Sequence, residues 1–428
     1  MGDRSYKTQM KTDRDHSRLV TIGLAVIPAV FVWFIFTALI HGAGPLTGQL
    51  FFGDTHDTFM DFYNCLHSVA GRDPYNEINK VQYPPLCELI FYVAGKLAPR
   101  GYDFANSYYL REVQSVTLTF VLFIFVPIIL SVYAIEDMSS LTAGRKRLLV
   151  LSVLLSSPFL YSFERGNIIL YSLAFTLLFI SLRNSESKVK REIALICLAL
   201  AFAIKIYPAA FGVLLLREKK IKEAVRCALY ALALFFLPFL CFGGFGKFML
   251  MIKWLTLSTG SSTAEGLGAK INFATVIRIY MSKFFGMEAD IAWPQTVAVI
   301  LAVILIACSI FVRREWMSAA MIALVICGMP AFSYFYVGVF LIIPFVMLTG
   351  KDEFGKADIA GLALLLLALA PYPVTFKAPE KSYDITVMQC ITGSVMLILS
   401  VLLIAVSLRD LALVFSRKEL LKDNGSKD

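Results

Sequence analysis

Apolar runs long enough to cross a membrane recur along this chain from Leu19 to Leu408. A hydrocarbon core of ~30 Å needs about 20 helical residues per crossing, and 58% of the residues are hydrophobic whereas only 17% are charged. The runs lack the alternation of apolar and polar residues that a membrane β-strand requires, so helices must satisfy the backbone hydrogen bonds. The sequence therefore predicts an all-α protein, built as a polytopic transmembrane helical bundle.

The apolar runs predict about 10 to 12 membrane segments, because each is near the length of one crossing. The expected bounds are 19–43, 115–135, 148–163, 166–182, 193–216, 227–244, 291–312, 317–330, 332–350, 359–375 and 388–408. The short linkers between them are basic, as at 145–147, 188–191, 217–226 and 313–314, and so is the tail from Arg409. The positive-inside rule places these linkers and both termini in the cytoplasm.

We therefore expect one membrane domain at 19–408, between cytoplasmic tails at 1–18 and 409–428, in the plasma (inner) membrane. Two long segments, 44–114 and 245–290, then face the extracytoplasmic side. The net charge of +9 is dispersed among the loops instead of forming one basic face. This pattern predicts membrane lipid, and no nucleic acid, as a partner.

The run 193–216 has basic flanks at both ends, which one straight crossing does not have. Lys205 and Pro208 lie near its middle. Proline removes a helical hydrogen bond, and a charged residue at that depth needs a partner. Two interpretations stay open: a broken, hairpin-like pair of short helices, or an ordinary proline kink with Lys205 reaching to the interface.

The segment 44–114 is too long for a simple connector and too rich in aromatic and apolar residues for disorder. We expect it to fold on the membrane surface as short helices. Cys65 and Cys87 both lie in it. They form either a disulfide, if the loop is extracytoplasmic, or a pair of free thiols.

Three carboxylates and an imidazole follow the first run within eight residues, at Asp54, His56, Asp57 and Asp61. If this stretch is helical, Asp57 and Asp61 share one face at i, i+4. Paired carboxylates in apolar surroundings hold a proton more readily, which makes one of them a usable base. The alternatives are a solvated acidic loop and a divalent-metal site. The metal is not favoured, because such sites need more fixed ligands than this cluster guarantees.

Further motifs follow in order along the chain. They are Gly71-Arg72-Asp73-Pro74-Tyr75, Tyr83-Pro84-Pro85, Arg165-Gly166-Asn167, Ile204-Lys205-Ile206-Tyr207-Pro208, Lys270-Ile271-Asn272 to Arg278, and Pro330 to Tyr336. This order resembles glycosyltransferase family 87, whose members have a GT-C fold and use polyprenyl-phosphate sugars. In the resemblance, the family's loop aspartate falls on Asp57, and Asp61 takes a position that is more often aromatic. Phe335 stands where the family commonly has a histidine.

The resemblance implies an inverting membrane glycosyltransferase. It would move a mannose-like hexose from a polyprenyl-phosphate donor to an extracytoplasmic lipid or glycan acceptor, without a cofactor. Asp57 would be the general base, with Asp61 as the second candidate. Breaking the donor bond leaves negative charge on the lipid phosphate, so we expect a cation there, Arg165 or Lys205. The remaining candidates for substrate binding are His56, Asn167, Tyr207 and Asn272.

Other interpretations stay open for Arg165 and for the whole chain. Arg165 instead forms an ion pair with Glu164 or anchors its helix at the interface. The main alternative function is a transporter or flippase for a polar lipid or solute, which also explains many helices and a lysine at membrane depth. A second alternative is a non-catalytic partner in an envelope-polysaccharide complex. A transporter leaves the acidic, aromatic first loop unexplained, and in a non-catalytic partner the loop carboxylates would be replaceable.

Overall fold

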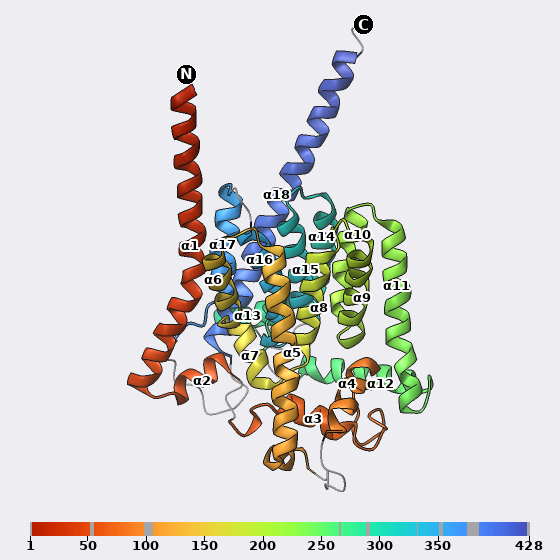
Figure 1. Ribbon diagram of the computed structural model, residues 1–428. Coiled ribbons are helices and arrows are strands. Elements are labelled where there is room, and N and C mark those ends of the chain that lie inside the picture. The colour runs from red at the N-terminus through yellow and green to blue at the C-terminus, as the bar shows by residue number, and fades with distance from the viewer. Residues whose placement is uncertain are drawn as a thin grey trace.

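The computed structural model describes the backbone of residues 2–51, 55–97, 106–264, 267–287, 292–331, 333–350, 354–374 and 385–425. Within these ranges the chain is built from helices, with an isolated antiparallel bridge between Lys270 and Tyr334. The helices form one bundle, and both chain ends emerge at the same end of it (Figure 1). We refer to this as the tail end, and to the opposite end, where the first long segment folds, as the loop end. The all-α prediction is confirmed.

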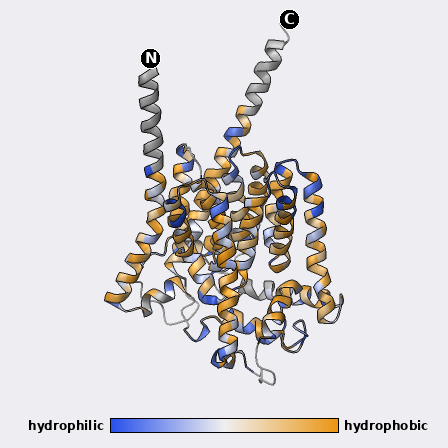
Figure 2. Ribbon diagram, viewed as in Figure 1, coloured by the Kyte–Doolittle hydropathy of each residue, from blue (hydrophilic) through white to orange (hydrophobic). Residues whose placement is uncertain are grey.

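Five helices of the described chain are long and apolar enough to span a membrane. They are α1 (Gly2–His41, from Arg18), α5 (Gln114–Met138), α11 (Ile221–Phe236) continued by η4 (Leu237–Phe242), α14 (Trp293–Phe311) and α18 (Val387–Gly425, to Leu413). A sixth span is made by α6 (Ala143–Leu154) and α7 (Ser157–Arg165), if this pair, bent by 56°, counts as one. These helices are mainly hydrophobic (Figure 2), which suits contact with lipid.

The other predicted spans are shorter helices packed within the bundle. They are α8 (Ile169–Leu182), α9 (Lys188–Ile204), η3 (Tyr207–Gly212) with α10 (Val213–Arg217), α15 (Glu315–Gly328), η5 (Phe335–Leu341) with α16 (Ile342–Thr349), and α17 (Lys356–Leu369). α15, for example, is buried along nearly its whole length. Length and composition therefore support five or six spans, and the count of about 10 to 12 segments stays a prediction for the shorter helices.

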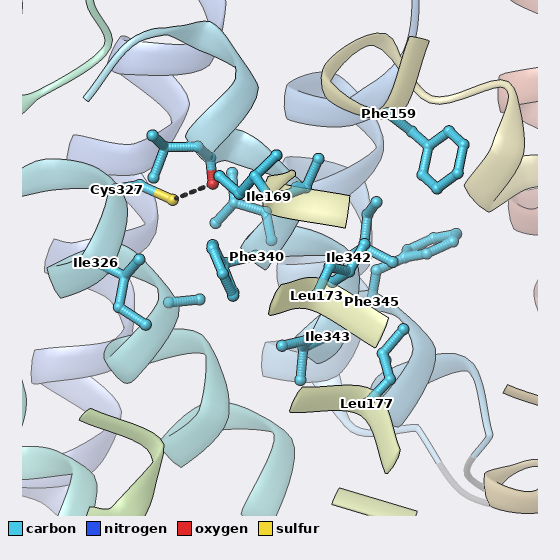
Figure 3. Packing of buried hydrophobic residues seen from close by; sticks show 14 of the residues in the cluster. Phe159, Ile169, Leu173, Leu177, Ile326, Cys327, Phe340, Ile342, Ile343 and Phe345 are labelled. Carbon is cyan, nitrogen blue, oxygen red and sulfur yellow. Dashed lines mark hydrogen bonds between the residues drawn. The ribbon is translucent and has the colours of Figure 1, made fainter. Parts of the chain in front are cut away.

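A hydrophobic core joins α8, α15, η5 and α16 (Figure 3). Leu173 of α8, Ile342 of α16 and Phe340 of η5 all belong to this core. The Cys327 thiol donates to the Val337 carbonyl oxygen at 3.3 Å. Each such side chain contributes about 1.5 to 3 kcal/mol when fully buried. This core fixes η5, and with it the tyrosines around its start, against α7.

Residues 188–217 form the hairpin-like pair of helices, so the first of the two interpretations is confirmed. α9 ends before Lys205, which has extended backbone angles (φ −140°, ψ 124°), and the chain returns through η3 and α10. The two ends of the pair meet: Arg183 Nε lies 3.1 Å from Glu218 Oε1, and Lys220 donates to the Arg183 carbonyl oxygen at 3.2 Å. The basic flanks thus share one end of the bundle, as the positive-inside rule requires.

The described parts of the first long segment fold as short helices, as predicted. They are α2 (Gly44–Leu50), η1 (Thr55–Asp57), α3 (Met60–Ser68), α4 (Pro85–Gly95) and η2 (Ser107–Glu112). The second long segment contributes α12 (Lys247–Ala264) and α13 (Phe273–Phe285). Trp254 of α12 donates from Nε1 to the Tyr75 carbonyl oxygen at 2.9 Å, which joins the two segments. Cys65 and Cys87 are buried free thiols.

Candidate active site

Asp57 and Asp61 lie on two separate helical turns. Asp57 ends η1, and Phe59 has a left-handed backbone conformation (φ 64°) before α3 begins at Met60. The Phe59 N–H donates to the Glu164 carbonyl oxygen at 2.7 Å, which ties this corner to the end of α7. The helix face expected from the i, i+4 spacing is therefore not formed. The corner nevertheless brings both carboxylates to α7.

Arg165, the last residue of α7, bridges the two carboxylates. Its Nη2 and Nε lie 2.6 and 3.2 Å from Asp61 Oδ1. Its Nη1 lies 3.2 Å from Asp57 Oδ2 and donates to the Asp57 carbonyl oxygen at 3.0 Å. The Arg165 side chain is 9% exposed, against 23% for Asp57 and 21% for Asp61. Arg165 therefore forms ion pairs with these two aspartates, whereas the sequence had suggested Glu164 as its ion-pair partner.

The two aspartates differ in how firmly their oxygens are held. Asp61 Oδ2 accepts from Asn167 Nδ2 at 2.6 Å, so both of its oxygens receive short bonds. Asp57 Oδ1 accepts from the hydroxyl of the exposed Tyr108 at 3.0 Å. Short bonds to a charged group are the strong ones, so Asp61 is fixed and Asp57 is held more loosely. We refer to Asp57, Asp61, Arg165 and Asn167 as the carboxylate cluster.

Gly166 allows the turn that sets Arg165 and Asn167 side by side. Its φ is +62°, and a Cβ there would lie 3.0 Å from Phe120 Cε2 and 3.1 Å from Phe62 Cβ. We expect Gly166→Ala to lower the free energy of unfolding by about 2 kcal/mol, because left-handed backbone is costly for L-residues and the neighbours are tight. Thermal unfolding of the purified protein measures this loss.

Gly212→Ala is the matched control for that substitution. Gly212 lies in η3 with an ordinary helical conformation, and a Cβ there meets nothing within 4 Å. The melting temperature of this variant should stay within experimental error of the wild type. Equal losses in the two variants would contradict the role given to Gly166.

Lys205, at the tip of the hairpin, is enclosed by tyrosines from two other segments. Its Nζ lies 3.9 Å from the Tyr83 ring centroid and 5.7 Å from that of Tyr336. Such contacts hold an ammonium group without neutralising it. The residue is 5% exposed, which excludes the interpretation in which it reaches to the interface. We refer to Lys205, Tyr83 and Tyr336 as the lysine cage.

The lysine cage and the carboxylate cluster adjoin. Burial raises the pKa of the Tyr83 hydroxyl well above its usual value, and Cys65, Tyr336 and Asp61 raise it further. Tyr336 also packs against Tyr161 of α7, with 6.4 Å between ring centroids, one helical turn before Arg165. The two groups therefore lie within electrostatic range of each other at the loop end.

The remaining predicted site residues lie in different places. Tyr207 lies two residues after Lys205 in the sequence. Its hydroxyl is buried without a hydrogen-bond partner among the described residues. Asn272 caps α13, accepting from the Thr275 N–H at 2.8 Å, and its Nδ2 donates to the Ala331 carbonyl oxygen at 3.2 Å. Both ends of the Asn272 amide thus bond the backbone. His56 is exposed on η1.

The described part of the chain offers no set of ligands for a metal centre. There, no group of three or more His, Cys, Asp or Glu side chains is arranged to hold a metal ion. Asp54, the first carboxylate of the predicted cluster, lies outside the described residues. The two described aspartates instead share one cation, the Arg165 guanidinium.

Sequence reasoning did not single out Tyr108 or the role of Tyr83 and Tyr336. Tyr83 and Tyr336 belong to motifs that were recognised, but a tyrosine in an apolar setting usually only packs. Their contact with Lys205 depends on the hairpin, which brings residues far apart in sequence together. Tyr108 reaches Asp57 from η2 through the fold of the first segment, and no local pattern marks it.

The comparisons with known proteins identify the family of the chain. No curated protein matches the chain. The profile of glycosyltransferase family 87 matches residues 82–344, more than half of the 428 residues. The matched range includes Arg165, Asn167 and the lysine cage, and it begins after Asp57 and Asp61. The chain is therefore a member of glycosyltransferase family 87 and a membrane glycosyltransferase.

Proposed function

We propose that this glycosyltransferase moves a mannose-like hexose from a polyprenyl-phosphate donor to a hydroxyl group of a lipid or glycan acceptor. The reaction takes place on the extracytoplasmic face of the plasma membrane, in a helical bundle of the GT-C type. The observation that supports this most is the pairing of the carboxylate cluster with the lysine cage at the loop end. A base beside a cation suits a reaction in which a hydroxyl loses a proton while a phosphate gains charge.

Asp57 is the proposed general base. It accepts the proton of the acceptor hydroxyl while the hydroxyl oxygen attacks the anomeric carbon. The bond between that carbon and the phosphate oxygen breaks, and its electron pair goes to the phosphate. One carboxylate suffices for this inverting reaction, whereas retention needs a second one as nucleophile. The looser hold on Asp57, compared with Asp61, supports its assignment as the base.

Lys205 is the proposed cation for the leaving phosphate. Arg165 already binds both aspartates, so much of its charge is balanced within the carboxylate cluster. Lys205 lies among tyrosine rings, and an ammonium group binds a phosphate oxygen as a compact point charge. The Tyr207 hydroxyl, without a partner among the described residues, offers a hydrogen bond to the same phosphate.

Lys205→Met should raise the KM for the lipid donor by about 10- to 100-fold, the value of one hydrogen bond to a charged group. The methionine keeps most of the side-chain volume, so the protein should still fold. Initial rates at varied donor concentration measure the effect. Lys253→Met is the control, because Lys253 pairs with Glu77 on the exposed surface of the loop end. Equal increases in both variants would mean that general surface charge, and not Lys205, binds the donor.

The donor class is tested with purified protein in lipid nanodiscs. One sample receives a radiolabelled polyprenyl-phosphate hexose and the other receives the same hexose linked to a nucleotide. We expect labelled product from the lipid donor alone, with the anomeric configuration inverted. Transfer from the nucleotide sugar, or a product with retained configuration, would overturn it.

A further inference from the structure

Glu88 is a carboxylic acid buried where the first long segment covers the hairpin tip. It lies in the first turn of α4 and has no exposed surface. Its Oε2 lies 3.4 Å from Ser68 Oγ, and its Oε1 is buried without a hydrogen-bond partner among the described residues. A carboxylate is costly to bury in this way. Glu88 has no role in the proposed reaction as described above.

The contacts of Glu88 indicate that it is uncharged at neutral pH. Ser68 has one hydroxyl proton, which it donates to the Cys65 carbonyl oxygen at 2.8 Å. The contact to Glu88 Oε2 is then satisfied when the Glu88 carboxyl carries a proton and donates it to the Ser68 oxygen. Burial raises the pKa of Glu88 to about 8, against the opposing effects of Ser68, Lys205 and Cys87. The carboxyl is therefore mostly protonated at pH 7 and mostly ionised at pH 9.

Lys205 is the charged group that acts on Glu88. The other titratable groups near it are the thiols of Cys65 and Cys87 and the hydroxyl of Tyr75, and burial raises the pKa of all three. These three therefore stay neutral across the pH range of interest. α5 and η4 meet α4 through aromatic rings, Phe123 and Phe242, and α11 does so through Phe235. Lys205 is thus the charged group whose surroundings change when Glu88 ionises.

We propose that Glu88 is a positioning residue of the donor site, which controls whether the charge of Lys205 is available to the donor phosphate. As a neutral acid, Glu88 packs on the hairpin tip and leaves the Lys205 ammonium to bind the phosphate. As a carboxylate, it adds a negative charge within electrostatic range of that ammonium, which offsets its positive charge and weakens phosphate binding. This inference rests on the proposed function, because it concerns the same phosphate-binding cation.

The expected result is a rise of the donor KM with pH that depends on Glu88. In the wild type, KM should rise about tenfold from pH 7 to pH 9, as ionisation of a single group with a pKa of about 8 requires. Glu88→Gln keeps the size and neutrality of the protonated acid. Its KM at pH 7 should stay within about twofold of the wild type and should change by less than about twofold up to pH 9.

The test measures kcat and KM for a radiolabelled polyprenyl-phosphate hexose between pH 6 and pH 9, with the full-length protein in nanodiscs. Glu77→Gln is the control, since Glu77 lies on the same segment with its side chain 70% exposed, and its profile should follow the wild type. If Glu88→Gln does not fold, Glu88→Met, neutral and of similar volume, replaces it with the same expectation.

The outcomes separate this inference from the proposed function. If the wild type transfers hexose but the KM of Glu88→Gln or Glu88→Met follows the wild-type profile, the role of Glu88 is overturned and the function stands. A folded Glu88→Gln protein that binds donor poorly at pH 7 also overturns it, because a neutral side chain should suffice there. If the wild type does not transfer hexose from the lipid donor at any pH, the proposed function fails, and this inference fails with it.

Discussion

Replacing Asp57 with asparagine is expected to slow hexose transfer by a factor of about 10² to 10⁴, the usual contribution of a general base. The amide cannot take the proton of the acceptor hydroxyl, but it keeps an acceptor oxygen for Arg165, which lies 3.2 Å from the carboxylate. The fold should therefore survive. The donor KM should change little, because Lys205 is untouched. Measurement of kcat and KM with purified protein separates the two effects.

Asp61→Asn is the comparison that assigns the base. Asp61 receives the shorter bonds from Arg165 and Asn167, at 2.6 Å each, so the loss of its charge should lower the melting temperature. It should slow transfer less than Asp57→Asn does. If Asp61→Asn proves the more damaging to kcat while the protein stays folded, Asp61 is the base and Asp57 is a holding residue.

Removing Arg165 should have the largest effect on stability. Arg165→Met leaves two carboxylates beside each other without their shared cation, and breaking a buried ion pair in this way costs about 3 to 5 kcal/mol. The Arg165 side chain is 9% exposed, so water screens the loss poorly. Arg165→Lys should recover only part of it, because one ammonium group cannot reproduce the fork that reaches both aspartates. Thermal unfolding of the purified variants measures the loss.

Arg226→Met is the control for Arg165→Met. Arg226 also pairs with a glutamate, at 2.8 Å from Glu192, but its side chain is 47% exposed. Exposed pairs are worth about 0 to 1 kcal/mol, so this variant should unfold close to the wild-type temperature. The double variant with Arg165→Met and Asp61→Asn should be more stable than Arg165→Met alone. Unchanged stability of Arg165→Met would show that the carboxylate cluster is not held as described.

The helical bundle and the hairpin were predictable because charge and hydrophobicity act locally. Basic flanks at both ends of one apolar run, with Lys205 and Pro208 inside it, required either a turn back or a miscounted crossing. The structure has the turn back. The number of true spans was less predictable, because a short apolar helix surrounded by protein, such as α15, has the same composition as one in lipid.

The candidate site was predicted in its residue types but not in its pairings. Asp57, Asp61 and Arg165 were all singled out, yet the sequence suggested a phosphate as one possible partner of Arg165, and the structure pairs it with the two aspartates. Their meeting depends on the left-handed turn at Phe59 and on the end of α7, which no local pattern encodes. The sequence did not predict a role for Glu88, because only the fold shows that this residue is buried.

The most direct test of the central claim is an assay in vesicles that contain the purified protein in one known orientation. A water-soluble, short-chain polyprenyl-phosphate hexose and an acceptor are added outside, where they reach one end of the bundle only. We expect hexose transfer with release of the lipid phosphate when the loop end faces outward, and none when the tail end does. Turnover at the tail end, or movement of intact donor into the vesicle without cleavage, would contradict it.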